Sequence, residues 1–265
     1  MKPTMCESSI EDTTIGRIVI PSNVPQGFAL FYTTADFPGR LDHGVAKTLR
    51  SVVRGHFGID ASLSTCNQVH GRDLAQVGSD SGWSECDSCD ALWTDNTAVA
   101  LAIKVADCLP VSIVDPVRRV MANIHSGWRG AVQQITAATI DTLKKSSAFQ
   151  PSSAWAWLGP SIRVCCFEVG EEVVEEFTRS YGDAARFIDR SHDKPHIDLV
   201  GLTAAVLRKK GFEDRRILDT GLCTKCDRGV ARLRGGTHGA ETPGLFHSYR
   251  REPKRGGRNL AIAAQ

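Results

Sequence analysis

Short apolar stretches separated by turn residues predict strands along most of the chain. Residues 99–105, 111–114 and 120–124 are the clearest, and Asp115 and Pro116 form a turn between the last two. The apolar and β-branched content of weaker stretches predicts further short strands at residues 17–20, 28–33, 65–69, 154–158 and 217–220.

Other segments carry the period of an amphipathic helix. One helix is predicted over residues 45–57, ending near Gly58, and a second over residues 131–146. A third is predicted over residues 168–181, because apolar residues recur there at intervals of four. A fourth is expected over residues 199–210, with Asp198 as its N-cap and Gly211 at its end.

This mixture of strands and helices indicates a mixed α/β fold. The chain has 265 residues, enough for one large domain or two small ones. No repeat or strong linker divides it, so we expect a single domain over residues 17–265. The polar residues 1–16 are expected to be disordered. Residues 227–243, rich in Gly, Arg and Thr, are expected to form a mobile loop.

Composition narrows the class of protein. Hydrophobic residues make up 42% of the chain, charged residues 23%, and the net charge is +2, so neither nucleic acid nor a membrane is indicated as a partner. No apolar run approaches the ~20 residues that span a bilayer, and residues 1–11 lack a secretory signal, so a cytoplasmic protein is expected. Nine cysteines do not suit a fully paired disulfide framework, which favours reduced thiols, metal ligands or a nucleophile.

Three residues at predicted strand ends form a candidate metal site. His70, Cys108 and His125 each follow a strand-like segment, and imidazole and thiolate are donors that zinc prefers. Three protein ligands leave one position for water, which zinc can activate as a nucleophile. Alternatively, Cys108 is a nucleophile with either histidine as its base, and Asp107 orients the imidazole or acts as a base. The remaining alternative is two core histidines and a buried thiol.

Several neighbouring residues have candidate roles in binding. Arg129, in a glycine-flanked loop, could hold phosphate or a ribose hydroxyl, or bond to loop carbonyls instead. Arg250 lies in a basic C-terminal cluster that is otherwise a solvated surface. Two Cys-x-x-Cys pairs, Cys86/Cys89 and Cys223/Cys226, could form a structural zinc site, but their separation lies well outside zinc-ribbon spacing.

Five motifs, in order along the chain, resemble one known family. They are NQVHG at residues 67–71, ADCLPV at 106–111, HSGWRG at 125–130, GPSI leading to CCFEVG at 159–170, and CT at 223–224 followed by FHSYRR at 246–251. The family was first described as multicopper polyphenol oxidases, or laccase-domain proteins. It is associated with purine nucleoside phosphorylase and adenosine deaminase activity, and one bacterial branch with peptidoglycan editing. The resemblance weakens before Thr65.

The resemblance implies a fold, a cofactor and an activity. The fold would be one mixed α/β domain with layered sheets flanked by helices, of the type grouped with putative cysteine hydrolases. His70, Cys108 and His125 would be zinc ligands, with Arg250 facing the site. The substrates would be phosphate and adenosine, inosine, guanosine or methylthioadenosine, cleaved by phosphorolysis, or adenosine deaminated by water.

Three other functions stay open at this point. A cysteine hydrolase acting on peptidoglycan precursors would use Cys108 and a histidine without metal. A non-enzymatic protein could bind nucleosides in the same pocket. A copper polyphenol oxidase is the least supported, because three N/N/S ligands and eight scattered histidines do not suit a multicopper cluster.

Overall fold

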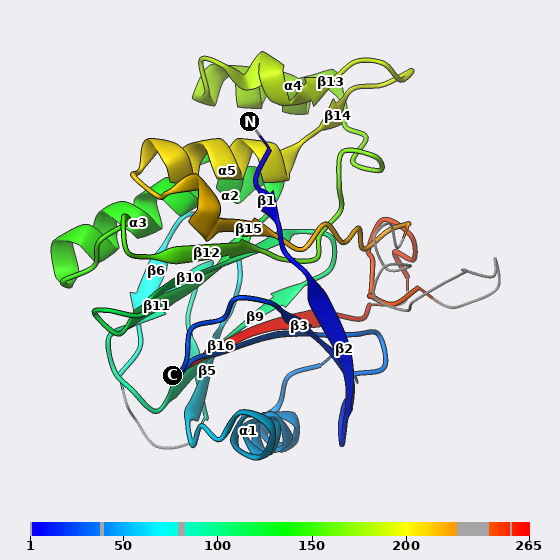
Figure 1. The fold of residues 1–265 in the computed structure, drawn as a ribbon. Helices are drawn as coiled ribbons and strands as arrows, with labels where there is room; N and C mark the ends of the chain where they lie inside the picture. The colour runs from blue at the N-terminus through cyan, green and yellow to red at the C-terminus, as the bar shows by residue number, and fades with distance from the viewer. Residues whose placement is uncertain (1, 38–39, 79–82, 227–243, 255) are drawn as a thin grey trace.

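Two seven-stranded sheets lie face to face, with helices on both outer sides, in the computed structural model of the chain (Figure 1). The structure describes residues 2–37, 40–78, 83–226, 244–254 and 256–265. This layered arrangement confirms the mixed α/β class that the sequence predicts. Within these ranges, no helix is both long and apolar enough to cross a membrane.

The first sheet carries the strands that lead into the candidate site. Its centre is an antiparallel hairpin in which Val111 pairs with Ile124 and Pro110 with His125. In spatial order its strands are β1 (Thr4–Met5), β15 (Ile217–Asp219), β12 (Trp155–Leu158), β10 (Leu109–Asp115), β11 (Val120–Ser126), β8 (Ala91–Thr94) and β6 (Leu74–Gln76).

The second sheet is formed by segments from both ends of the chain. In spatial order its strands are β2 (Ser8–Thr13), β3 (Gly16–Pro21), β4 (Ala29–Thr33), β16 (Asn259–Ala264), β9 (Val99–Val105), β5 (Ser62–Cys66) and β7 (Trp83–Cys86). A small separate ribbon pairs β13 (Ile188–Asp189) with β14 (His196–Ile197). The C-terminal strand β16 is central, between β4 and β9.

Helices cover the outer face of each sheet (Figure 1). Helix α1 (His43–Phe57) covers the second sheet, and the other four α-helices lie on the side of the first. These four are α2 (Trp128–Val132), α3 (Ile135–Ser146), α4 (Glu171–Ser180) and α5 (Leu199–Lys209). Two short 3-10 helices are η1 (Ala184–Phe187) and η2 (Asp214–Arg216).

Side-chain alternation along the strands explains the layers. On β9, Leu101 and Ile103 face the core between the sheets, whereas Ala100 and Ala102 face α1. Both faces of the strand are therefore buried, which is why residues 99–103 form a continuous apolar run. Each large apolar side chain removed from water in this way contributes roughly 1.5–3 kcal/mol.

Most predicted elements are present, and their ends follow the predicted caps. Helix α1 ends at Gly58, whose φ of 71° is the left-handed conformation that glycine adopts readily. The Asp198 side chain accepts a hydrogen bond from the Gly201 N–H at 2.9 Å and so caps α5.

Three expectations need correction. The segment before Arg17 is not disordered, because β1 pairs with β15 and β2 pairs with β3. The helix expected over residues 131–146 is instead divided between α2 and α3. Gln134 separates them, because its φ of 61° is not a right-handed helical conformation. The helix expected from residue 168 begins after Gly170. The loop expected over residues 227–243 lies outside the described residues.

A buried asparagine joins the two sheets by hydrogen bonds. Asn123 on β11 donates from its amide to the carbonyl oxygens of Leu101 and Ala261, at 3.0 and 2.8 Å, and both acceptors belong to the second sheet. Its amide oxygen accepts from the Ser112 hydroxyl on β10 at 3.0 Å. The side chain is fully buried, so these bonds satisfy polar groups that water does not reach.

Replacing this asparagine tests how much the link between the sheets stabilises the fold. We expect Asn123→Ala to lower the free energy of unfolding by about 2–3 kcal/mol, because it leaves buried polar groups unpaired. Urea unfolding followed by circular dichroism measures this. The exposed Asn67→Ala is the matched control and should change stability by less than about 0.5 kcal/mol. Equal stabilities of the two variants would contradict the role of Asn123.

Candidate metal centre

A buried carboxylate fixes the position of His125. His125 lies on β11, and its Nδ1 is 2.7 Å from Oδ1 of Asp90, the residue that precedes β8. Asp90 is fully buried and His125 is 3% exposed. Because the carboxylate accepts the Nδ1 proton, Nε2 is the ring nitrogen that remains for a metal or for Cys108.

The same carboxylate shapes the loop that carries His70. Its two oxygens accept hydrogen bonds from the backbone N–H groups of Val69, His70 and Gly71, at 3.1, 3.0 and 2.7 Å. His70 has a φ of 60°, which is uncommon for a residue with a side chain, and these bonds hold it there. Burial would raise the pKa of the Asp90 carboxyl, but the bonds from His125 and this loop outweigh burial and lower it.

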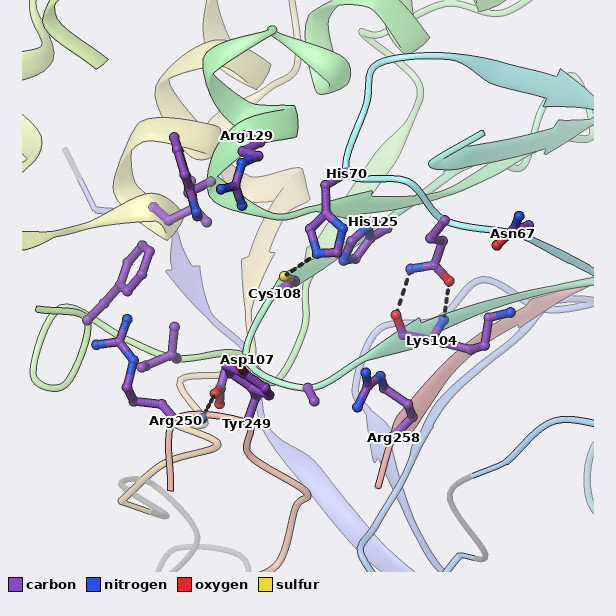
Figure 2. Close-up of a pocket in the computed structure, with 16 residues that line it drawn as sticks. Asn67, His70, Lys104, Asp107, Cys108, His125, Arg129, Tyr249, Arg250 and Arg258 are labelled. Atoms are coloured by element: carbon purple, nitrogen blue, oxygen red, sulfur yellow. Dashed lines mark hydrogen bonds between the residues drawn. The ribbon is translucent and has the colours of Figure 1, made fainter. Parts of the chain in front are cut away.

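Cys108 reaches the two histidines from the turn before β10. Asp107 has a φ of 84°, so the chain reverses sharply between β9 and β10 at this point. Cys108 Sγ lies 4.0 Å from His70 Nε2 (Figure 2). The rings of His70 and His125 meet edge to face with their centroids 4.8 Å apart. The ligand atoms of all three residues lie within 4.8 Å of one another, so this group could hold a metal ion.

Electrostatics favour an ionised thiol at this point. Burial alone would raise the pKa of Cys108, but its interactions with His125 and His70 outweigh burial and lower the pKa to about 6. Burial would likewise lower the pKa of His125, yet the hydrogen bonds to Asp90 and Cys108 raise it to about 9. A thiolate is both the form that ligates metals and the form that attacks substrates.

The three residues lie on the wall of a pocket of about 470 Å³. This volume is in the range of small-molecule sites. One part of the wall is apolar and aromatic, and is formed by Trp128, Ile162, Phe167, Leu199 and Tyr249. Another part is cationic, formed by Lys104, Arg129, Arg250 and Arg258 (Figure 2). The pocket therefore suits a ligand with a flat apolar portion and an anionic portion.

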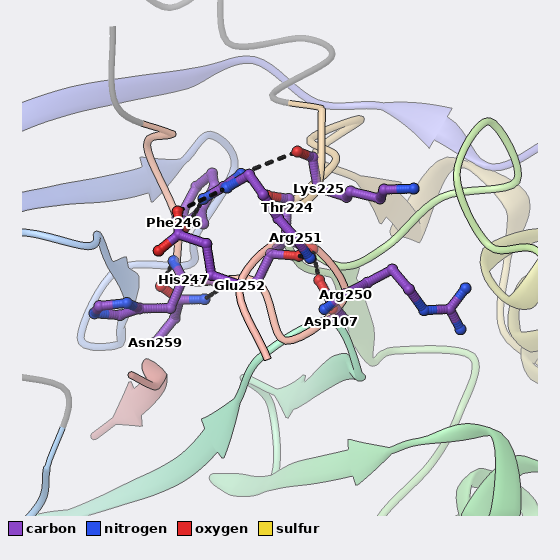
Figure 3. Close-up of polar contacts among 10 residues, drawn as sticks. Asp107, Thr224, Lys225, Phe246, His247, Arg250, Arg251, Glu252 and Asn259 are labelled. Carbon is purple, nitrogen blue, oxygen red and sulfur yellow. Dashed lines mark hydrogen bonds and ion pairs between the residues drawn. The ribbon is translucent and has the colours of Figure 1, made fainter. Parts of the chain in front are cut away.

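Asp107 organises the floor of the pocket. Its Oδ1 accepts from the Thr224 hydroxyl and its Oδ2 from the Arg250 backbone N–H, both at 2.6 Å (Figure 3). The contact expected between Asp107 and an imidazole is instead made by Asp90, because the reversed turn at Asp107 directs its side chain toward the C-terminal segment. The catalytic role of Asp107 stays a prediction.

The predicted arginines differ in their surroundings. The Arg129 guanidinium lies over the Trp128 ring, 4.3 Å from its centroid, and faces the pocket. The Arg250 side chain donates to the Glu168 carbonyl oxygen at 2.9 Å and also lines the pocket. Glu168, expected to begin a helix, lies before α4 and pairs with Lys194 at 2.8 Å.

Besides Asp90, Gln68 is a supporting residue that the sequence does not reveal. The Gln68 side chain pairs with the backbone of Lys104 in both directions, at 2.7 and 2.9 Å, which fixes the start of the His70 loop against the end of β9. Gln68 and Lys104 are 36 residues apart, and nothing in their local sequence indicates that they meet.

The chain is similar to known proteins of one family. The profile of the family described as multi-copper polyphenol oxidoreductase laccase matches residues 41–265. The chain belongs to this family. It is 34% identical over 140 residues to an adenosine deaminase, RL5, from an unknown prokaryotic organism, covering 52% of this chain and 53% of that protein. It is 29% identical over 182 residues to the purine nucleoside phosphorylase YlmD of Bacillus subtilis, covering 65% and 57%.

The chain thus spans little more than half the length of these two curated relatives. The crystal structure of YlmD from Geobacillus stearothermophilus has the same fold, with a TM-score of 0.77 over 98% of this chain and 99% of that one. The two sequences are 21% identical in that alignment, so the likeness concerns the fold.

Gly127 lies against two of the three candidate ligands. A Cβ at Gly127 would lie 2.9 Å from Cys108 Sγ and 3.2 Å from His70 Cδ2. We therefore expect Gly127→Ala to lower zinc affinity at least about 10-fold, since it displaces a ligand without straining its own backbone, whose φ is −71°. Calorimetric titration of the apo-protein with zinc measures this.

The control for this substitution is Gly55→Ala on α1, where an added Cβ meets nothing within 4 Å. Its zinc affinity should equal that of the wild type. Unchanged affinity in Gly127→Ala would show that His70 and Cys108 do not bind one metal together.

Proposed function

We propose that this chain is a zinc-dependent enzyme that acts on purine nucleosides, by phosphorolysis of the glycosidic bond, by deamination of adenosine, or by both. The observation that carries the proposal is the convergence of His70, Cys108 and His125 on a pocket with both aromatic and cationic walls. The activities named for the two relatives support the substrate class.

The donor set favours zinc over copper. Two imidazoles and one thiolate suit a tetrahedral zinc with one open position. A multicopper centre requires several clustered histidines. In the described part of the chain, only two groups of three or more candidate ligands occur, and the second of them contains no histidine. A zinc ion bound by these three residues would supply Lewis-acid activation of water or of the substrate.

The walls of the pocket fit the two parts of the proposed substrates. Phe167 and Trp128 offer aromatic surface on which a purine can stack. Arg129 and Arg250 place guanidinium groups where phosphate oxygens can accept charge-assisted hydrogen bonds (Figure 2). Asp90 fixes His125, and Asp107 fixes the backbone at Arg250, so both kinds of binding group are held before the substrate arrives.

Two measurements on the purified protein test the proposal together. Elemental analysis should detect zinc, and chromatography after incubation with adenosine should detect adenine only when phosphate is present, or inosine without phosphate. Cys108→Ala should retain the fold, lose the zinc of this site and lose at least about 100-fold in activity, because the metal contributes several kcal/mol to the reaction. Cys86→Ala, which removes a thiol outside this site, should keep both. Full activity of Cys108→Ala would overturn the assignment.

A second candidate is a metal-free cysteine hydrolase. Its support is the approach of the Cys108 thiol to the imidazoles of His70 and His125. For this function, iodoacetamide should alkylate Cys108 in metal-free protein, and activity should be lost in proportion. Activity that instead returns only when zinc is added would exclude this candidate.

The cationic wall can be tested separately from the metal. We expect Arg129→Gln to raise the KM for phosphate in phosphorolysis by about 10–100-fold, because a charge-assisted hydrogen bond contributes roughly 1.5–3 kcal/mol. Deamination uses no phosphate and should change little. Steady-state kinetics of both reactions measures this, with the exposed Arg179→Gln on α4 as the control. An unchanged KM for phosphate would place the anion elsewhere.

A further inference from the structure

Four cysteines that are far apart in the sequence meet beside the candidate metal centre. Cys165 and Cys166 lie in the turn between β12 and α4, and Cys223 and Cys226 follow β15. Their four sulfur atoms lie within 4.8 Å of one another, and those of Cys165 and Cys226 are 3.7 Å apart. We call these four residues the cysteine cluster.

The spacing of these sulfurs matches a tetrahedral metal. With zinc–sulfur bonds of about 2.3 Å, the sulfurs of a tetrahedral site are roughly 3.8 Å apart. The separation between Cys165 and Cys226 already has this value, and the others need to close by no more than about 1 Å. Four thiolates without a water position form the closed type of zinc site, which holds structure rather than performing chemistry.

Backbone hydrogen bonds hold the two segments that carry the cluster. The N–H of Thr224 donates to the Ser161 carbonyl oxygen at 3.0 Å, and the N–H groups of Cys166 and Phe167 both donate to the Arg163 carbonyl oxygen at 2.8 Å. Cys223 is fully buried, whereas Cys226 is exposed. The candidate ligands thus lie on two segments that hydrogen bonds join, and the exposed Cys226 is the ligand that an ion from solvent can reach first.

Metal binding at the cluster would be linked to proton release. Each thiol would give up its proton to solvent as it coordinates a divalent ion, because the thiolate is the form that ligates a metal.

We propose that Cys165, Cys166, Cys223 and Cys226 bind a structural zinc ion that fastens the loop after β12 to the segment after β15. This site is separate from the one formed by His70, Cys108 and His125. It differs from the site that the two Cys-x-x-Cys pairs could form, Cys223/Cys226 with Cys86/Cys89. Cys86 lies on β7, beside Cys66 of β5 in the other sheet.

The position of this zinc explains what it stabilises. Cys166 precedes Phe167, which lines the pocket, and Cys223 precedes Thr224, whose hydroxyl holds Asp107. The Arg251 guanidinium donates to the carbonyl oxygens of Thr224 and Lys225, at 2.7 and 3.0 Å, and so joins the C-terminal segment to the cluster (Figure 3). The ion would therefore fix the floor of the pocket without contacting substrate.

Zinc stoichiometry of the 265-residue chain, purified under reducing conditions, tests this inference. We expect about two zinc ions per chain in the wild type and about one in Cys108→Ser. Cys226→Ser is chosen because Cys226 is exposed, and it should lose one zinc while keeping the other. Cys86→Ser, which alters the other Cys-x-x-Cys pair, is the matched control and should keep two.

X-ray absorption at the zinc edge of Cys108→Ser gives a second measurement that does not depend on altering the cluster. The remaining zinc should have only sulfur neighbours, at about 2.3 Å. Zinc-free Cys108→Ser, nitrogen or oxygen neighbours in this spectrum, or a disulfide between Cys165 and Cys226 in the reduced protein would overturn the inference. None of these results would affect the proposed function, which depends on the other site.

Discussion

The candidate metal centre depends on one buried carboxylate. Asp90 accepts three backbone N–H groups of the His70 loop and holds Nδ1 of His125, so a single side chain sets the positions of two of the three candidate ligands. A buried carboxylate is costly unless it is fully paired, and these four bonds satisfy it. The four hydrogen bonds to Asp90 are therefore cooperative, because the loss of any one of them weakens the other three.

The sheets explain why these groups meet at all. Strands β10 and β11 form the central hairpin of the first sheet, and their register puts His125 opposite Pro110, two residues from Cys108. The second sheet packs against this hairpin through apolar side chains and through the amide of Asn123. Both faces of this hairpin are buried, so polar side chains reach solvent only at the ends of its strands. The pocket lies at these strand ends.

The two candidate metal sites differ in what they leave open. Two histidines and a cysteine would leave one coordination position of a tetrahedral metal open to the pocket, which suits chemistry. Four cysteines would leave none, which suits a structural role. A hydrogen bond from the Thr224 hydroxyl, beside Cys223, to Asp107, beside Cys108, connects them. A metal bound at the cysteine cluster would therefore also support the turn that carries Cys108.

The sequence by itself determined what depends on near neighbours. Apolar periodicity predicted β9 and α1, because the spacing of apolar residues and the local composition encode strands, helices and caps. That His70, Cys108 and His125 act together is what the resemblance of their motifs to one family implies, and the structure brings their ligand atoms within 4.8 Å of one another. Only the tertiary structure decided which distant groups meet. It paired β1 with β15 and β2 with β3, so the N-terminal segment is part of both sheets. It placed Asp90, not Asp107, beside His125. It also brought Cys223 and Cys226 next to Cys165 and Cys166, not next to Cys86 and Cys89. These contacts follow from strand order and register, which depend on the packing of the whole chain and leave no periodic signal in the sequence around each residue.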